Sequence, residues 1–148
     1  MKAPIQFGKY YLLDRVAVGG MAEVFRSKTF GLEGSERIVA LKRMLPMVSA
    51  DKELVSMFID EAKLAIQLNH PNICQVFDWG KVDDSYYLAM EYVSGCDLRA
   101  VFQRCKQQVI DGSTTMPTAQ ACLVVMKLCE GLDYAHNKKD SVGHDLEL

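Results

Sequence analysis

The 148-residue sequence has no long apolar run, no paired-cysteine motif and no large excess of charge of either sign. A membrane-spanning helix needs about 20 apolar residues in succession, and neither such a run nor the apolar core of a signal peptide is present. The formal net charge is −2, so charge does not favour nucleic acid or an anionic membrane as a partner. We therefore expect a cytoplasmic protein with no nucleic-acid partner and no membrane contact from this segment.

The five cysteines form no C-x-x-C pair and have no interleaved histidines. Zinc sites and redox motifs are recognised by such pairs, and an odd number does not suit a disulfide framework. We expect no metal site, and reduced thiols that pack as small apolar groups in a reducing compartment.

What the chain does have is strand-forming sequence interrupted by glycine and aspartate. Runs rich in branched and aromatic residues predict five strands, over residues 10–18, 22–28, 37–45, 73–79 and 86–93. Gly19-Gly20 divides the first two, and Gly80 with an Asp83-Asp84-Ser85 turn divides the last two. Short connections between successive strands favour an antiparallel sheet.

Helical periodicity appears in three segments, residues 51–69, 97–107 and 117–136. The first has Ser49 or Asp51 as its cap and must end before Pro71. Its apolar stripe predicts a core-facing helix, so the fold class is α+β: a five-stranded sheet with one packed helix, followed by two further helices.

Glu61 is the most informative residue of the first helix. Its neighbours three and four positions away are all apolar, namely Met57, Phe58, Leu64 and Ala65. An ionised carboxylate is costly to bury alone, so we expect Glu61 to be removed from solvent and either to take up a proton or to have a cationic partner.

Lys42 is the best candidate for that partner. Strand alternation places it on the same face as Ile38, Ala40 and Met44. Arg43 competes, because the opposite face is equally apolar and a guanidinium would pair as well. A third possibility is that the Lys42 amine extends along the sheet to water, and periodicity does not decide among them.

Gly19-Gly20 also has two interpretations. Glycines between two strands let backbone N–H groups approach an anion such as a phosphate closely. Equally, the pair can form an ordinary hairpin turn in which glycine supplies a positive φ.

Taken together, these elements resemble the small lobe of a eukaryotic-type protein serine/threonine kinase, and bacterial members of that class in particular. The pattern G-x-G-x-x-G-x-V corresponds to residues 17–24, V-A-I-K to residues 39–42, and the helix glutamate to Glu61. His70-Pro-Asn-Ile73 resembles the turn after that helix, and Met90-Glu-Tyr-Val93 the gatekeeper and hinge. Two of the three loop glycines are replaced, by Ala17 and Ala22, which puts the mobility of the loop in question.

The resemblance implies an ATP site. Val16 and Val24 would cover adenine, Ala40 would admit it beside Met90, and backbone groups near Glu91 and Val93 would bind its edge.

The same resemblance assigns the phosphates to Lys42, paired with Glu61, and to the loop that contains Ala17, Gly19 and Gly20. Asp97 resembles the acidic group that contacts ribose, although an aspartate at the start of a helix is also favoured by the helix dipole.

Phosphoryl transfer in this family also needs an H-R-D-x-x-x-x-N loop and a D-F-G aspartate that binds Mg²⁺, and neither is in the sequence. Asp145, in Gly143-His-Asp-Leu146, is either the base of a degenerate loop or part of a connection to a catalytic loop beyond Leu148; we favour the second. We therefore expect residues 1–93 to be the ATP-binding small lobe, and residues 94–148 the hinge and first helices of a large lobe truncated before the catalytic loop. The metal ligands would lie outside this chain, which should be inactive alone.

The function implied is transfer of the γ-phosphate of ATP to hydroxyls of a protein substrate, which the sequence does not identify, by the full-length form. The alternatives are a non-catalytic, pseudokinase-like nucleotide-binding or interaction module and, more distantly, a small-molecule phosphotransferase. Without the rest of a large lobe, the apolar side chains Val124, Leu128 and Leu132 should face water or a second copy of the chain, so we expect self-association.

Overall fold

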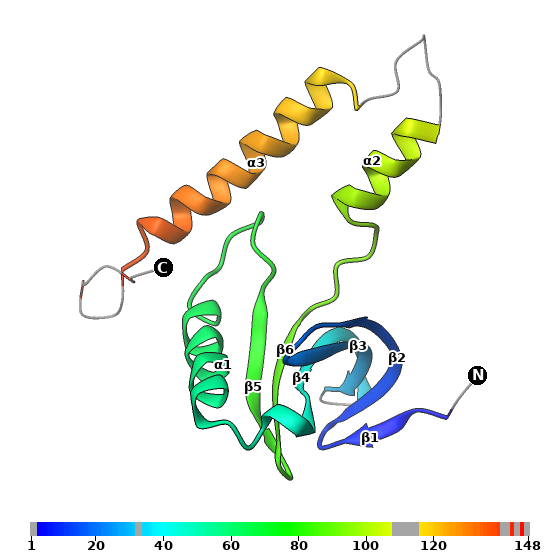
Figure 1. The fold of residues 1–148 in the computed structure, drawn as a ribbon, viewed down its shortest axis with the longest axis vertical. Coiled ribbons are helices and arrows are strands. Elements are labelled where there is room, and N and C mark those ends of the chain that lie inside the picture. The colour runs from blue at the N-terminus through cyan, green and yellow to red at the C-terminus, as the bar shows by residue number, and fades with distance from the viewer. Residues whose placement is uncertain (1–2, 32–33, 108–115, 140–142, 144–145, 147–148) are drawn as a thin grey trace. The chain divides into compact units, whose positions relative to one another are not determined.

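The computed structural model describes residues 3–31, 34–107, 116–139, 143 and 146. It divides into two compact units, Met1–Val93 and Ser94–Leu148, which are described separately below (Figure 1). Asp145 and the neighbouring His144, which the sequence analysis considers as part of a degenerate catalytic loop, lie outside the described residues.

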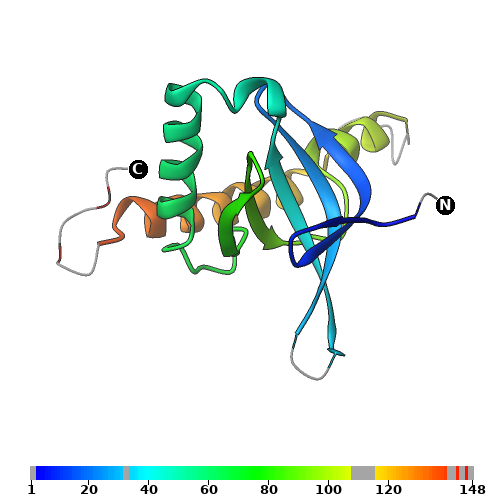
Figure 2. The ribbon, with the colours of Figure 1, turned by 90° about the horizontal axis from the view of Figure 1, so that it is seen from below.

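The first unit contains an antiparallel sheet in the order β1-β2-β3-β4-β6-β5. The strands are β1 (Ile5–Phe7), β2 (Tyr10–Val18), β3 (Ala22–Phe30), β4 (Glu36–Met44), β5 (Val76–Val82) and β6 (Ser85–Glu91). The sheet is strongly curled (Figure 2). The α+β architecture is confirmed, with one strand more than expected: β1 has only three residues, too few for alternation to mark it.

The strand break predicted at Gly80 is wrong. Gly80 lies within β5, directly opposite Tyr87 of β6, and a Cβ at Gly80 would come within 3.1 Å of the Tyr87 hydroxyl oxygen. Glycine here makes room for the tyrosine ring, and the turn falls later, at Asp83, whose φ is 51°.

The inner side of the curl holds an apolar cluster of buried residues, Phe7, Tyr10, Leu12, Val39, Leu41, Tyr87 and Ala89. Tyr87 contacts both Phe7 and Tyr10 edge to face, with ring centroids 5.8 and 5.5 Å apart. These contacts join residues of β1, β2 and β6, so the cluster holds the sheet in its curled form.

A polar network closes the curl. The Asp78 carboxylate on β5 accepts hydrogen bonds from the hydroxyls of Tyr10, at 2.7 Å, and Tyr87, at 3.0 Å, and pairs with the Lys9 ammonium at 2.9 Å. Burial raises the pKa of Asp78, but the hydrogen bonds from Lys9, Tyr10 and Tyr87 outweigh it, so its pKa lies below the usual range. Burial and the bond to Asp78 raise the pKa of Tyr87 to about 12.

The opposite side of the sheet packs against α1 (Lys52–Ala65). Phe58 and Ala62 of the helix are buried with Ala22, Met44, Val76 and Leu88 of the sheet. Of the two predicted caps, Asp51 is confirmed: its carboxylate accepts hydrogen bonds from the N–H groups of Glu53 and Leu54. The helix ends four residues earlier than expected, at Ala65 rather than residue 69.

The second unit contains α2 (Leu98–Gln107) and α3 (Thr118–His136). Large apolar side chains of α3 are exposed, among them Leu123, Val125, Met126, Leu128 and Leu132. Across the described part of the chain, no helix has the length and apolar character needed to cross a membrane.

The cysteine thiols are free, as expected, but the expected burial is wrong for most of them. Cys74, Cys96, Cys122 and Cys129 are exposed, and only Cys105 is partly buried.

Candidate functional site

Lys42 of β4 and Glu61 of α1 form an ion pair. The Lys42 Nζ lies 2.7 Å from Oε1 and 2.9 Å from Oε2 of Glu61. The predicted partnership is therefore present, but the predicted burial of the acid is wrong, because the Glu61 side chain is 50% exposed and that of Lys42 is 21% exposed. The buried line of α1 runs through Phe58 and Ala62, so Glu61 lies at the border of the packed face.

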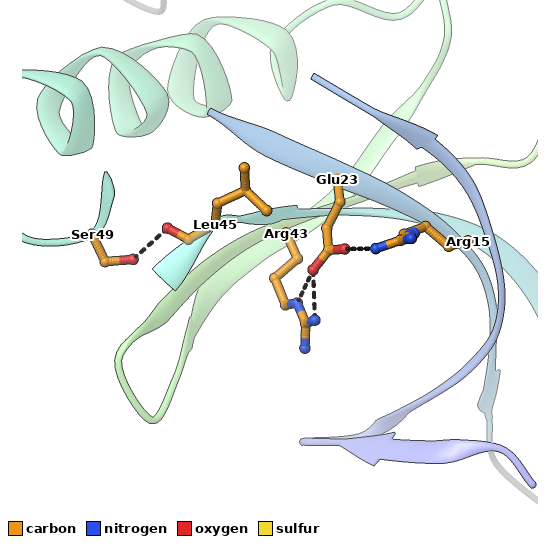
Figure 3. A network of polar contacts seen from close by, with 5 residues as sticks. All are labelled: Arg15, Glu23, Arg43, Leu45 and Ser49. Atoms are coloured by element: carbon orange, nitrogen blue, oxygen red, sulfur yellow. Dashed lines mark hydrogen bonds and ion pairs between the residues drawn. The ribbon is translucent and has the colours of Figure 1, made fainter. Parts of the chain in front are cut away.

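Arg43 is not the partner of Glu61. As the next residue along β4 it points to the inner side of the curl, where its Nε and Nη2 lie 3.2 and 2.6 Å from Oε1 of Glu23. Arg15 binds the other oxygen of Glu23, with Nη1 3.4 Å from Oε2 (Figure 3). Alternation along one strand thus sends the lysine and the arginine to different carboxylates on opposite faces.

Several of the residues expected to bind nucleotide share the face of the sheet that contains Lys42. Val24 of β3 is the cross-strand partner of Lys42, and Ala40, two residues before the lysine, is the cross-strand partner of Met90 on β6. Cross-strand partners lie on the same face of a sheet. Val24, Ala40, Lys42 and Met90 therefore form one continuous patch.

Ala17 and Val16 lie at the edge of this patch, near the end of β2. Ala17 is the cross-strand partner of Val24. Val16 falls in a register irregularity between Arg15 and Ala17, and it is exposed. A bulge of this kind re-aims side chains locally.

Gly19 and Gly20 connect β2 to β3, and the Gly19 N–H donates to the Ala22 carbonyl at 2.7 Å. Neither glycine is among the residues with positive φ, so the interpretation as a turn that needs glycine for its backbone conformation is wrong. A Cβ at Gly20 would meet no atom within 4 Å, and one at Gly19 would make only an ordinary contact with the Ala22 carbonyl. The fold itself therefore does not require glycine at either position.

Ala22, which stands where the family pattern has a glycine, is buried beside its cross-strand partner Met44 and Phe58. Its methyl group contributes to the core under α1.

Glu91 ends β6 and is fixed by three contacts. Its N–H donates to the Gln75 carbonyl at 2.8 Å, and its carboxylate accepts the Gln75 N–H at 3.5 Å. Its own carbonyl accepts a weak hydrogen bond from the Cys74 thiol at 3.4 Å. Val93, two residues on, is exposed and is the last residue of the first unit.

Asp97 belongs to the second unit. Its carboxylate accepts a hydrogen bond from the Ala100 N–H at 2.7 Å, and its carbonyl accepts one from the Val101 N–H at 3.1 Å. Asp97 therefore caps the N-terminus of α2, the position that the helix-dipole interpretation expects.

Sequence reasoning missed Glu23, a buried carboxylate with two arginine partners. The available signal was an acid on the β3 face that also carries Phe25 and Ser27. Within the residues that the structure describes, no group of three or more metal-ligating side chains is placed to hold a metal ion.

The model of the protein kinase domain matches residues 10–146 of this chain.

Known proteins similar to the chain include bacterial kinases. It is 36% identical over 142 residues to the tyrosine-protein kinase MasK of Myxococcus xanthus, which covers 96% of the chain and 21% of MasK. It is 34% identical over 131 residues to the serine/threonine-protein kinase PknE of Mycobacterium tuberculosis, with 88% of the chain and 21% of PknE covered. For PrkC of Bacillus subtilis, also named a serine/threonine-protein kinase, the identity is 30% over 132 residues, 89% of the chain and 19% of PrkC. The chain spans about a fifth of the length of these relatives.

Among solved structures, the kinase domain of Mycobacterium tuberculosis PknI superimposes with a TM-score of 0.72 at 28% identity. The match covers 93% of this chain and 51% of the PknI chain.

Proposed function

The chain belongs to the protein kinase domain family, and from that premise we propose that it is the ATP-binding part of a protein serine/threonine kinase. In the full-length protein, the γ-phosphate of ATP would be transferred to hydroxyls of a protein substrate. Residues 1–93 would be the small lobe, and residues 94–148 the hinge and the first helices of the large lobe.

The observation that carries the proposal is the ion pair between Lys42 and Glu61. An ammonium group has three N–H donors, and two close contacts to the carboxylate, at 2.7 and 2.9 Å, leave donor capacity for a further anion. In protein kinases a strand lysine paired with a helix glutamate binds the phosphates of ATP. We assign that role to Lys42, with Glu61 holding its amine in place.

The patch around Lys42 suits the base of ATP. Val24, Ala40 and Met90 offer apolar surface on the lysine's own face of the sheet, and the exposed Val16 would add to it from β2. An apolar surface with a few polar groups at its edge is the usual character of a small-molecule site.

The edge of the base would be bound by backbone groups of Glu91 and Val93. The Glu91 N–H already donates to the Gln75 carbonyl, which fixes the strand end. The Glu91 carbonyl accepts only a weak hydrogen bond among the described residues, from the Cys74 thiol, and would be the acceptor for an adenine amino group.

The hairpin from Ala17 through Gly19 and Gly20 would cover the phosphates. The open space around Gly20 supports this, because a glycine that neither backbone conformation nor packing requires is free to let a ligand approach the main chain. The family resemblance assigns the ribose to Asp97, which caps α2 within the second unit.

Mg²⁺ would accompany ATP, but the sequence contains neither the H-R-D nor the D-F-G motif whose residues bind the metal and orient the substrate hydroxyl. Transfer is therefore proposed for the whole protein, and nucleotide binding for this chain. Because a similar protein, MasK, is named a tyrosine kinase, phosphoamino-acid analysis of a substrate labelled by the full-length protein should be part of the test.

Calorimetric titration of Mg-ATP into the chain tests the proposal directly. We expect saturable binding, reduced at least tenfold in Lys42→Met, since charge-assisted hydrogen bonds are worth about 1.5–3 kcal/mol. Lys63→Met is the matched control, because Lys63 pairs with Asp60 on the exposed side of α1. Equal affinities for the unsubstituted chain and Lys42→Met would contradict the assignment.

A further inference from the structure

We propose that Glu23 is a positioning residue for the phosphate-covering hairpin, acting through Arg43 and Arg15 on the side of the sheet away from the nucleotide. The inference rests on the proposed function and extends it to residues that would not touch ATP.

The pairing register places Glu23 at the base of the hairpin. Its cross-strand partner on one side is Val18, the last residue of β2 before the glycines, and on the other side Arg43 of β4. The Glu23 side chain bridges β2, β3 and β4 at this level, since it accepts two hydrogen bonds from Arg43 and one from Arg15 (Figure 3).

The ion-pair cluster lies directly behind the proposed site, because the sheet is one layer thick. Arg43 follows Lys42, and Glu23 precedes Val24, which is the cross-strand partner of Lys42 on the other face. The residue before Glu23, Ala22, accepts the Gly19 N–H that closes the hairpin. A movement of β3 at Glu23 would therefore also move Val24, which lies beside Lys42, and the glycine turn that is bonded to Ala22.

Stability alone gives little reason for a charge at this position. Glu23 is only 5% exposed, and burying an ionised carboxylate is costly unless it is paired. Replacing a buried ion pair by apolar residues of similar volume is often neutral or stabilising, whereas such pairs can fix one arrangement of the chain. A carboxylate bound from two strands suits that orienting role.

The guanidinium of Arg43 is itself held in place. It lies 5.5 Å from the ring centre of Phe7 and 5.1 Å from that of Phe25, within the range of cation–π attraction. Two donors of its planar group then reach one oxygen of Glu23. Lysine has no such fork and would not reproduce this geometry.

Loss of the Glu23 charge should therefore affect binding of the adenine base and binding of the phosphates differently. Val24 and Ala40 are held by the backbone ladders on either side, so the base-binding surface should survive loss of the Glu23 charge. The tip of the hairpin, at Gly19 and Gly20, is positioned by the hairpin base at Glu23. Without the Glu23 charge the tip should lose its alignment with the phosphates, and small misplacements in a binding site are costly.

The test compares Mg-ATP with adenosine by calorimetry on the whole chain. For Glu23→Gln we expect Mg-ATP affinity to fall on the order of tenfold while adenosine affinity changes less than about twofold. Arg43→Lys should show the same split to a smaller extent. The control is Tyr10→Phe, which removes a hydrogen bond to Asp78 and should lower the melting temperature without changing the ratio of the two affinities.

The outcomes separate this inference from the proposed function. If the unsubstituted chain binds Mg-ATP and Glu23→Gln binds both ligands with an unchanged ratio, the positioning role is overturned and the proposed function stands. If the unsubstituted chain does not bind Mg-ATP, the proposed function fails and the positioning role with it. Should Glu23→Gln not fold by circular dichroism, Arg43→Lys decides by the same ratio.

Discussion

Tyr10 on β2 and Asp78 on β5 are joined by a 2.7 Å hydrogen bond, although they are 68 residues apart and their strands are not neighbours in the sheet. The bond exists because the sheet curls until these strands approach each other. The Asp78 carboxylate also accepts the Tyr87 hydroxyl and pairs with Lys9, so one side chain ties the curl together.

Asp78 should make the stability of the chain depend on pH. Its pKa in the folded protein lies below the ordinary aspartate value of 3.8, so its contribution is present above about pH 4 and is lost as the pH falls through the folded pKa. We expect Asp78→Asn to lower the free energy of unfolding by roughly 1–3 kcal/mol at pH 7, and to weaken the loss of stability as the pH falls from 7 through the folded pKa of Asp78. Urea unfolding across that range measures both effects.

Asp84→Asn is the matched control for Asp78, because the Asp84 side chain is fully exposed and pairs with nearby Lys81. It should change the unfolding free energy by less than about 0.5 kcal/mol. An Asp78→Asn variant with the same stability and pH profile as the unsubstituted chain would contradict the role of Asp78 in stabilising the curled sheet.

Gly80 and Gly20 should respond oppositely to alanine. A Cβ at Gly80 would crowd the Tyr87 ring and hydroxyl at 3.1–3.3 Å, so Gly80→Ala should destabilise the fold by roughly 1–3 kcal/mol. A Cβ at Gly20 meets no atom within 4 Å, so Gly20→Ala should leave the melting temperature nearly unchanged while it weakens Mg-ATP binding. Thermal unfolding followed by calorimetric titration distinguishes the two, and a strongly destabilised Gly20→Ala would show that the loop glycine serves the fold.

The exposed apolar side chains of α3 should cause self-association. Leu128 and Leu132, one helical turn apart, are both among its exposed large apolar residues, and such surfaces promote association. We expect light scattering after size exclusion to give a mass above 16.6 kDa that rises with concentration, and Leu128→Glu with Leu132→Glu to return it to that of the monomer. Lys127→Gln, on the same helix and paired with Glu130, should leave the mass unchanged. A monomer at high concentration without the leucine substitutions argues against this surface.

Much of this fold follows from local patterns in the sequence. Alternation in β4 placed Lys42 and Arg43 on opposite faces of the sheet, but it did not decide which face meets α1. Apolar periodicity predicted α1 and five of the six described strands. Helical spacing did not predict the exposure of Glu61 correctly. Apolar residues lie on both sides of Glu61 along α1, and their spacing does not say which side of the helix faces the core. Local patterns could not reveal the contacts of Glu23 with Arg43 and Arg15, because these depend on how β2, β3 and β4 are paired. They also gave the wrong role for Gly80, because that role depends on Tyr87 of the neighbouring strand.

The central claim is that Lys42 and Glu61 act as one unit in binding ATP, and a double-mutant cycle tests it most directly. Mg-ATP affinity would be measured by calorimetry for the unsubstituted chain, Lys42→Met, Glu61→Gln and the double variant. We predict that each single change weakens binding and that the double variant binds about as tightly as Lys42→Met, because the glutamate acts through the lysine. Additive losses, or unchanged affinity in Lys42→Met, would contradict the account.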